Sequence, residues 1–477
     1  MSWVLFSIVV LNILAILTMI FIERRKPEII ISWLVILTFL PILGFILYVL
    51  FGSGLSLKTR RMLKRKILFE DSHDRFIWEE LKRIPELPTA EKELVKYNQR
   101  ASRSLPYFDN DVQIFTNGLD KIAALKKDLL AARHSINMEY YIFDDSGVGK
   151  EIMDILCQKA REGIKVKLIF DSVGCLRAPR RFFRRLKKAG GEVAEFFPPL
   201  FAIRLINLKM NYRNHRKIAV IDGKIGYVGG INIRDDHMGR NKRLSPWRDT
   251  HLKIRGSAVY GLQNAFFNDW FFCKRRQQSS AELTMLGYFP KVERVGNVTA
   301  QIISSGPESK VHYIKDAYIK MISSAKKQVV LQSPYLIPDE IFIAALKAAV
   351  KSGVRVIVML PEIPDKKFVY LATLSFARDL VESGVEIYLY KGFLHSKMLM
   401  VDDTCVSIGT CNADNRSFAL NFEINANLYG KQILAKCQEI VNEDLANSTQ
   451  IDVTFFKKKP FTSKLGQTIF RMFAPLL

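Results

Sequence analysis

The N-terminal part of the chain is dominated by two apolar runs. Trp3 to Ile22 and Ile29 to Phe51 contain no charged side chain. At about 1.5 Å per residue, each run is long enough to cross the roughly 30 Å hydrocarbon core of a bilayer as a helix. A cleaved signal peptide would begin with basic residues, whereas this chain begins MSWVLFSIVV. The pattern predicts two transmembrane helices, at about residues 3–22 and 29–51. The alternative is a hairpin that dips into the membrane without crossing it.

Basic residues beside these runs indicate an orientation. Three cations lie between the runs, and six follow the second run: Lys58, Arg60, Arg61, Lys64, Arg65 and Lys66. Because cytoplasmic flanks of membrane helices carry the excess of Lys and Arg, the larger group places the rest of the chain on the cytoplasmic side. We therefore expect a multi-pass protein of the cell membrane, with the bulk of the chain that follows the two runs in the cytoplasm.

Beyond a polar connector (67–107), strand-like and helix-like patterns alternate. Short β-branched and aromatic runs occupy residues 112–118, 135–143, 164–171 and 217–230, and helical spacing of apolar positions occupies 119–132 and 150–162. Such alternation is typical of an α/β fold in which helices flank a mixed sheet.

The second half of the sequence repeats the first. AQIISSG (300–306) is similar to VQIFTNG (112–118), and AVKSGVRVIVML (349–360) is similar to KAREGIKVKLIF (159–170). We expect two duplicated sandwich domains, at 108–297 and 298–477, after a membrane segment at 1–66. The basic tail from Phe455 to Leu477 is expected to lie in the membrane interface as an amphipathic helix, or to pack as a terminal core helix.

A histidine motif recurs in the two halves. His215, Lys217 and Asp222 have the spacing H-x-K-x4-D, and the same spacing recurs about 180 residues later in His395, Lys397 and Asp402. In each copy an asparagine lies seventeen residues after the histidine, at Asn232 and Asn412. Chance pairing of two such motifs in matching strand contexts is improbable, so the two copies are expected to be functional rather than accidental.

Composition and charge exclude some kinds of partner and site but do not identify the chemistry. The net charge of +24 fits nucleic acid, an anionic membrane or an acidic substrate, and the apolar runs favour the membrane. The six cysteines include no C-x2-C pair, which argues against a zinc site or a disulfide framework. No metal, cofactor or nucleic acid is expected, and the oligomeric state stays open.

The doubled motif resembles the active-site signature of the phospholipase D superfamily, and the whole chain resembles the bacterial cardiolipin synthases within it. The segments that carry the resemblance are MEYYIFDDSGVG, NYRNHRKIAVIDG, PWRDTHLKIRG, FLHSKMLMVDD and CNADNRSFALNFE. The resemblance implies that both motifs meet at one active site. It also implies that His215 is the nucleophile, that His395 is the general acid, and that Asp249 and Glu423 support them.

Phosphodiester chemistry explains these residue types. Charge on the equatorial oxygens of the transition state requires cationic and amide donors, which Lys217, Lys397, Asn232 and Asn412 supply without a metal. A neutral imidazole can attack phosphorus while an imidazolium protonates the leaving alkoxide. Asp222 and Asp402 are expected to hold the loops and lysines rather than react.

The resemblance implies a synthase that joins two phosphatidylglycerol molecules into cardiolipin and glycerol through a phosphohistidine. The alternative in the same class is a membrane-bound phospholipase D or phosphatidyltransferase that uses water or another alcohol as acceptor. A nuclease is disfavoured by the apolar runs, and an inactive membrane scaffold is disfavoured because all six motif residues are present.

Overall fold

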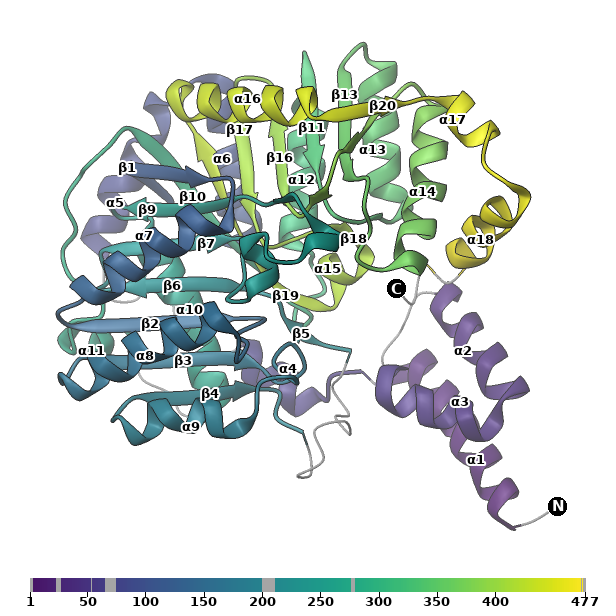
Figure 1. Ribbon diagram of the computed structural model, residues 1–477, viewed down its shortest axis with the longest axis horizontal. Coiled ribbons are helices and arrows are strands. Elements are labelled where there is room, and N and C mark those ends of the chain that lie inside the picture. Colours follow the sequence, from purple (N-terminus) through teal and green to yellow (C-terminus); the bar gives the residue numbers. More distant parts are fainter. Residues whose placement is uncertain are drawn as a thin grey trace.

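The computed structural model describes residues 3–22, 27–52, 54–64, 74–199, 211–275, 279–472 and 474 (Figure 1). In the N-terminal part, α1 (Trp3–Leu17) ends in a π-helical turn at 18–22, and α2 (Pro27–Phe39) is followed by α3 (Pro41–Leu47) and a second π-helical turn at 48–52. Pro41 separates α2 from α3, because Leu40 before it leaves the helical conformation. Across the described ranges, no single helix is long and apolar enough to cross a membrane. The predicted cations at 24–26 and at 65–66 lie outside the described residues.

The described part of the predicted connector is mostly helical. Helices α4 (Leu57–Lys64), α5 (Asp74–Lys82) and α6 (Thr89–Ser102) precede the first strand. The carboxylate of Glu80 on α5 accepts the backbone N–H of Phe108 at 2.9 Å, and Leu94 and Val95 of α6 are buried in the core of the C-terminal part. The connector is therefore packed against the body of the protein.

The chain from β1 onward forms two halves, and each half is defined by the strands that it contains. The first half contains β1 (Pro106–Phe115), β2 (Ser135–Tyr140), β3 (Lys165–Asp171), β4 (Glu192–Phe196), β5 (Arg213–Asn214), β6 (Lys217–Ile221), β7 (Ile225–Gly229), β8 (Trp247–Arg248) and β9 (His251–Arg255). The second half contains β10 (Val298–Ser305), β11 (Gln328–Gln332), β12 (Leu336–Ile337), β13 (Arg355–Pro361), β14 (Glu386–Tyr390), β15 (Phe393–Leu394), β16 (Met398–Val401), β17 (Cys405–Gly409), β18 (Ala413–Asp414), β19 (Asn421–Tyr429) and β20 (Ser448–Ile451).

Sixteen strands within the described residues form one continuous sheet. From the central antiparallel pair β1–β10, the first half runs outward in the order β1-β9-β7-β6-β2-β3-β4. The second half runs outward in the equivalent order β10-β19-β17-β16-β11-β13-β14, with β20 added at its edge. The strands that the sequence paired as repeats, β1 with β10 and β3 with β13, hold equivalent places. The expectation of a duplicated α/β fold with a mixed sheet is confirmed.

Helices cover the sheet in both halves (Figure 1). In the first half these are α7 (Gly118–Ala131), α8 (Gly147–Arg161), α9 (Arg180–Lys188), α10 (Val259–Lys274) and α11 (Ser280–Met285). In the second half they are α12 (Tyr313–Ser324), α13 (Glu340–Lys351), α14 (Lys367–Val381), α15 (Asn415–Ala419), α16 (Lys431–Ala446), α17 (Val453–Lys457) and α18 (Phe461–Met472).

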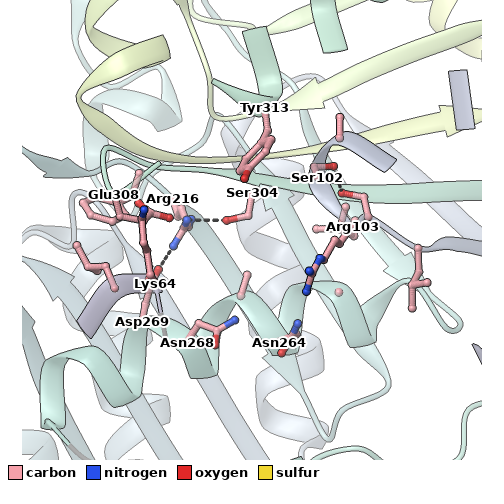
Figure 2. Close-up of a pocket in the computed structure, with 18 of the residues that line it drawn as sticks. Lys64, Ser102, Arg103, Arg216, Asn264, Asn268, Asp269, Ser304, Glu308 and Tyr313 are labelled. Atoms are coloured by element: carbon pink, nitrogen blue, oxygen red, sulfur yellow. Dashed lines mark hydrogen bonds and ion pairs between the residues drawn. The ribbon is translucent and has the colours of Figure 1, made fainter. Parts of the chain in front are cut away.

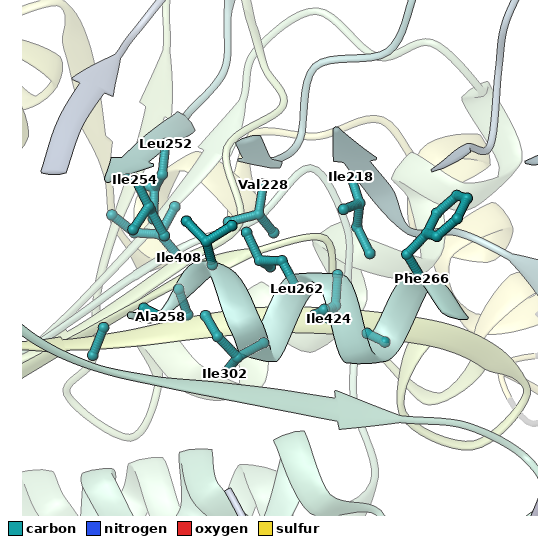
Figure 3. Close-up of a cluster of buried hydrophobic side chains, with 14 of the residues drawn as sticks. Ile218, Val228, Leu252, Ile254, Ala258, Leu262, Phe266, Ile302, Ile408 and Ile424 are labelled. Atoms are coloured by element: carbon teal, nitrogen blue, oxygen red, sulfur yellow. The ribbon is translucent and has the colours of Figure 1, made fainter. Parts of the chain in front are cut away.

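The two halves share one hydrophobic core around α10. Figure 3 shows Leu262 and Phe266 of α10 among strand side chains from the first half, such as Val228, and from the second half, such as Ile302 and Ile424. All five side chains are buried. Because burial of apolar surface is the main stabilising term in folding, the halves are fixed against each other by the same core that stabilises each of them.

Candidate active site

Each motif histidine is positioned by a short strand that pairs with the opposite half. Strand β5, just before His215, runs parallel to the start of β19, and the His215 amide donates to the carbonyl of Phe422 at 2.9 Å. Strand β15, just before His395, runs parallel to β8, and the His395 amide donates to the carbonyl of Arg248 at 2.6 Å. Both histidines therefore lie at the junction of the two halves.

This placement gives each imidazole a carboxylate from the other half. His215 Nδ1 lies 3.0 Å from both carboxylate oxygens of Glu423, and His395 Nδ1 lies 2.6 Å from Asp249 Oδ2. Both carboxylates are completely buried. A carboxylate at Nδ1 holds the proton on that nitrogen, which leaves Nε2 of each ring with a lone pair. The two carboxylates named from the sequence thus contact the two histidines, each across the junction.

Further hydrogen bonds orient the carboxylate of Glu423. It accepts the hydroxyl of Thr410 at 2.5 Å and the side-chain amide of Asn421 at 3.0 Å. Burial raises its pKa, but the interaction with His215, the charge of Lys217 and the hydrogen bond from Thr410 outweigh burial and leave the pKa below its ordinary value. Glu423 is therefore ionised at neutral pH.

The two motif lysines contact the backbone of the two motif histidines. Lys217 and Lys397 are buried, and each ammonium donates to the backbone carbonyl of the histidine two residues before it, at 2.6 Å in the case of Lys217. Burial lowers the pKa of Lys217 to about 7 and that of Lys397 to about 8, although nearby carboxylates oppose the shift. A bound anion would favour their charged forms.

The histidines are held uncharged in the free site. Burial lowers the pKa of His215 to about 4, with Glu423 opposing the shift and Lys217 adding to it. Burial, followed by Lys397 and Lys217, places the pKa of His395 well below its ordinary value. Both rings are therefore neutral at physiological pH until an anion enters, and a neutral ring is the form that can attack phosphorus.

The two motif aspartates bind backbone instead. Asp222 accepts the amides of residues 133–135, the shortest at 2.7 Å, and Asp402 accepts those of residues 326–328, the shortest also at 2.7 Å. Both have left-handed backbone, with φ of 54° and 48°. In the first half, Asp222 and Gly223 form the tight turn between β6 and β7, where the sequence pattern suggested one strand-like run. Each aspartate ties this turn to the start of the neighbouring strand.

The two asparagines differ in their contacts. The side-chain oxygen of Asn232 accepts the amide of Ile142 at 3.2 Å, and its nitrogen lies 3.1 Å from Nε2 of His237. Among the described residues, the buried side-chain oxygen of Asn412 has no hydrogen-bond partner. Both side chains line the cavity that contains the two histidines.

The cavity has a volume of about 820 Å³ and opens between the halves. Its two ends differ. Beside His395 the wall is aromatic, with ring centroids of Trp247, His237 and Phe393 at 5.2, 5.3 and 5.5 Å from the imidazole. Beside His215, Tyr141 packs at 4.9 Å, and the lining includes Arg213 and Arg416. The repeat thus builds a site with unlike ends.

Spacing alone did not identify several lining residues. These are Tyr141, Arg177, Arg213, Arg234, His237, Arg243, Trp247, Tyr335, Lys366, Phe393 and Arg416. His237 lacks the lysine partner that marks the motif histidines, yet it lies between Asn232 and Asp249. With Asp249 and His395 it presents ligand atoms within 4.8 Å of one another, which is the one group in the described residues with the spacing of a metal site. The carboxylate there is already hydrogen-bonded to His395.

Arg216, between His215 and Lys217 in sequence, points to a second cavity on the other side of the strand. Figure 2 shows its guanidinium between Asp269 and Ser304, with Glu308 and Tyr313 nearby. The guanidinium is paired with Asp269 and donates to the Ser304 hydroxyl at 2.6 Å. Because it also donates to the carbonyl of Glu423 at 3.3 Å, Arg216 fixes the strand that carries the His215 partner.

Two protein-family models match parts of the chain. The family model described as "Cardiolipin synthase, PLD-like domain" matches residues 125–245 and 318–445, and one described as "Phospholipase D-nuclease N-terminal" matches residues 10–53. The chain is 39% identical to the major cardiolipin synthase ClsA of Bacillus subtilis, over 98% of both chains. It is 40% identical to a cardiolipin synthase of Listeria innocua, over 100% of this chain and 99% of that protein.

Among solved structures, the fold is similar to that of phosphatidylserine synthase from Haemophilus influenzae. The TM-score is 0.61 at 15% identity, over 80% of this chain and 97% of that one. At this identity the likeness concerns the fold alone.

Proposed function

The chain belongs to the cardiolipin synthase family of phospholipase D-like phosphatidyltransferases, and from this we propose that it joins two phosphatidylglycerol molecules into cardiolipin and glycerol. Similarity over nearly the whole chain to named cardiolipin synthases supports the activity. The observation that carries the mechanism is the junction of the two halves, where two carboxylate-supported histidines line one cavity.

In the first half-reaction, Nε2 of His215 attacks the phosphorus of one phosphatidylglycerol. A P–N bond forms, the P–O bond to the headgroup glycerol breaks, and His395 gives its Nε2 proton to the departing oxygen. The negative phosphate and the carboxylate of Asp249 raise the pKa of His395 in the complex, so that it carries this proton. Both rings are neutral in the free site, so the choice of His215 as nucleophile follows the resemblance to the phospholipase D superfamily.

In the second half-reaction, His395 takes the proton of a hydroxyl on the second phosphatidylglycerol. That oxygen forms a P–O bond, the P–N bond breaks, and His215 returns to its neutral form. Lys217, Lys397, Asn232 and Asn412 would surround the non-bridging oxygens in both steps, where fixed donors stabilise the transition state most. The two steps balance, because one glycerol leaves the phosphorus and one lipid alcohol takes its place.

Membrane attachment through the N-terminal helices is part of this proposal. Large apolar side chains of α1, α2 and the π-helical turn at 18–22 are exposed, among them Trp3, Ile13, Phe21, Ile31 and Phe39. The match of residues 10–53 to an N-terminal family supports a conserved role for this segment. We propose that residues 3–22 and 29–51 form a membrane-spanning hairpin with the catalytic halves, divided near residue 297, on the cytoplasmic side. The excess positive charge then faces anionic lipid rather than nucleic acid.

The decisive experiment supplies the purified full chain with phosphatidylglycerol alone and identifies the products. Cardiolipin and free glycerol in equal amounts are expected. Phosphatidic acid as the main product would instead make the chain a phospholipase D with water as acceptor. His215→Ala should abolish turnover without loss of thermal stability, and retained turnover in that variant would overturn the mechanism.

A further inference from the structure

The C-terminal helix α18 exposes an apolar stripe. Phe461, Leu465, Ile469 and Met472 are 77, 47, 42 and 74% exposed. Their spacing of four, four and three residues places all four on one face of the helix. Apolar groups in a continuous row on a surface helix indicate a surface that something covers.

The opposite face of α18 is fixed to α14. A side chain added at Gly466 would come within 3.2 Å of Leu371, so the two helix backbones approach closely there. Phe470 packs on Phe368 with ring centroids 6.2 Å apart, and Arg471 forms an ion pair with Asp379 at 2.5 Å. The stripe therefore faces outward because the other face is already packed, and not because the helix is detached.

Cations flank the stripe. Lys457 and Lys458, just before the helix, are exposed, and Lys459 lies 4.2 Å from the ring centroid of Phe455. Lys464, on the first turn of α18, donates to the carbonyl of Lys457 at 3.0 Å. An apolar face bordered by lysines is the arrangement that binds the interface of anionic bilayers, since apolar burial and electrostatic attraction then add.

We propose that the stripe of α18 is a second membrane contact, which docks on the surface of an anionic bilayer. Charge complementarity argues for this occupant over another protein. In Figure 1, α18 and the apolar helices α1–α3 also lie toward the same end of the long axis. The inference rests on the proposed function in one respect, namely that the protein acts at a lipid surface.

Docking of α18 would place the mouth of the catalytic cavity at the lipid surface. Helix α14, on which α18 packs, begins at the cavity, and Lys366, Phe368 and Val369 line it. Phe368 is the residue that contacts Phe470 of α18. A phospholipid whose acyl chains stay in the bilayer can bring only its headgroup into the protein. The distance between the membrane surface and the start of α14 therefore determines whether the lipid phosphate can reach the histidines.

A direct test measures the depth of α18 in vesicles. In the full chain, Cys273 is the one cysteine that is not buried, so Cys273→Ser provides a background for a single nitroxide label. Leu465→Cys places the label on the stripe, and Leu130→Cys on α7 is the matched control, because both side chains are 47% exposed. The probe is a vesicle of phosphatidylcholine with or without phosphatidylglycerol.

The label at 465 is expected to become accessible to oxygen and protected from a water-soluble nickel chelate, more strongly with phosphatidylglycerol present. The label at 130 should stay in water. Equal aqueous exposure of the two labels would overturn the proposal. So would protection at 465 in detergent together with a doubled molecular mass, because a second copy of the chain would then cover the stripe.

Turnover gives an independent measure. Leu465→Ser combined with Ile469→Ser should raise KM for phosphatidylglycerol vesicles about tenfold, the effect of losing roughly 1.4 kcal/mol of apolar burial. It should leave kcat/KM for a monomeric short-chain substrate unchanged, and Leu130→Ser should change neither. Equal losses on both substrates would overturn the proposal in favour of a structural role.

The two proposals fail separately. Correct label depth without cardiolipin formation would reject the proposed function alone, and cardiolipin formation with the label at 465 in water would reject the docking of α18 alone.

Discussion

His215 in the first half lies with its Nδ1 3.0 Å from both carboxylate oxygens of Glu423, which belongs to the second half. The reverse crossing joins His395 to Asp249. Among the described residues, each motif histidine therefore takes its supporting carboxylate from the other half. The proposed catalytic groups form only when the halves pack, which explains why the shared core around α10 matters for the site as well as for stability.

Replacement of Glu423 by Gln should abolish most turnover while leaving the fold intact. The amide keeps the shape of the side chain but removes the charge, and its N–H can face Nδ1 and favour the wrong tautomer of His215. By comparison with catalytic triads, we expect kcat to fall by about 10³- to 10⁴-fold. Initial rates with phosphatidylglycerol and thermal melts of the variant test this. A loss of less than tenfold at unchanged Tm would show that the carboxylate does not act through His215.

Asp222 and Asp402 should behave as structural residues. Asp222→Ala removes the acceptor of three backbone amides and leaves a residue with φ of 54° that alanine disfavours. Together these effects should cost about 3 kcal/mol of unfolding free energy. Asp222→Asn keeps one acceptor and tolerates the backbone, so it should cost less. Denaturant unfolding measures both, and kcat per folded molecule should stay within about threefold of wild type. A large loss of kcat at unchanged stability would place this carboxylate in the chemistry.

Much of the architecture was predictable because the chain repeats. The superfamily resemblance of the doubled H-x-K-x4-D motif predicted one site formed from two segments, and His215 and His395 do line one cavity. The repeats between β1 and β10 and between β3 and β13 predicted the equivalent places that these strands hold in the sheet. Local spacing was sufficient here because equivalent strands bring equivalent loops to the same junction.

The remaining features depend on contacts between distant residues. Strands β5 and β15 contain only two residues each, so no periodicity marks them, yet they decide which carboxylate each histidine meets. The unlike ends of the cavity arise where the repeat has diverged. Two residues before the histidine, the first motif has Arg213 and the second has Phe393. Such differences become visible only when the halves are placed together.

The pH dependence of kcat/KM should report the groups of the free site. His215 must be neutral to attack, so the rate should fall below a pH of about 4, the pKa to which burial lowers it. Above that pH kcat/KM should decline gradually, because His395 is neutral in the free site and must take up its proton as the anion binds. The decline should steepen above pH about 7 to 8, where Lys217 and Lys397 lose the charge that holds the phosphate. Lys217→Arg keeps its charge and should move the alkaline limb to higher pH even if the rate drops. An alkaline limb that stays in place would exclude Lys217 as its source.

The unlike ends of the cavity make the roles of the two histidines separable by experiment. A donor lipid esterified to 4-nitrophenol needs no general acid, because nitrophenolate leaves without a proton. With this donor, His395→Asn should release a burst of about one nitrophenolate per active site and then stall, since no base remains to activate the acceptor hydroxyl. His215→Asn should give no burst. Label in the donor phosphate should remain on His215 as an acid-labile phosphoramidate. A burst confined to His215→Asn would reverse the two roles, and turnover in the wild type without any trapped label would argue for direct transfer between lipids.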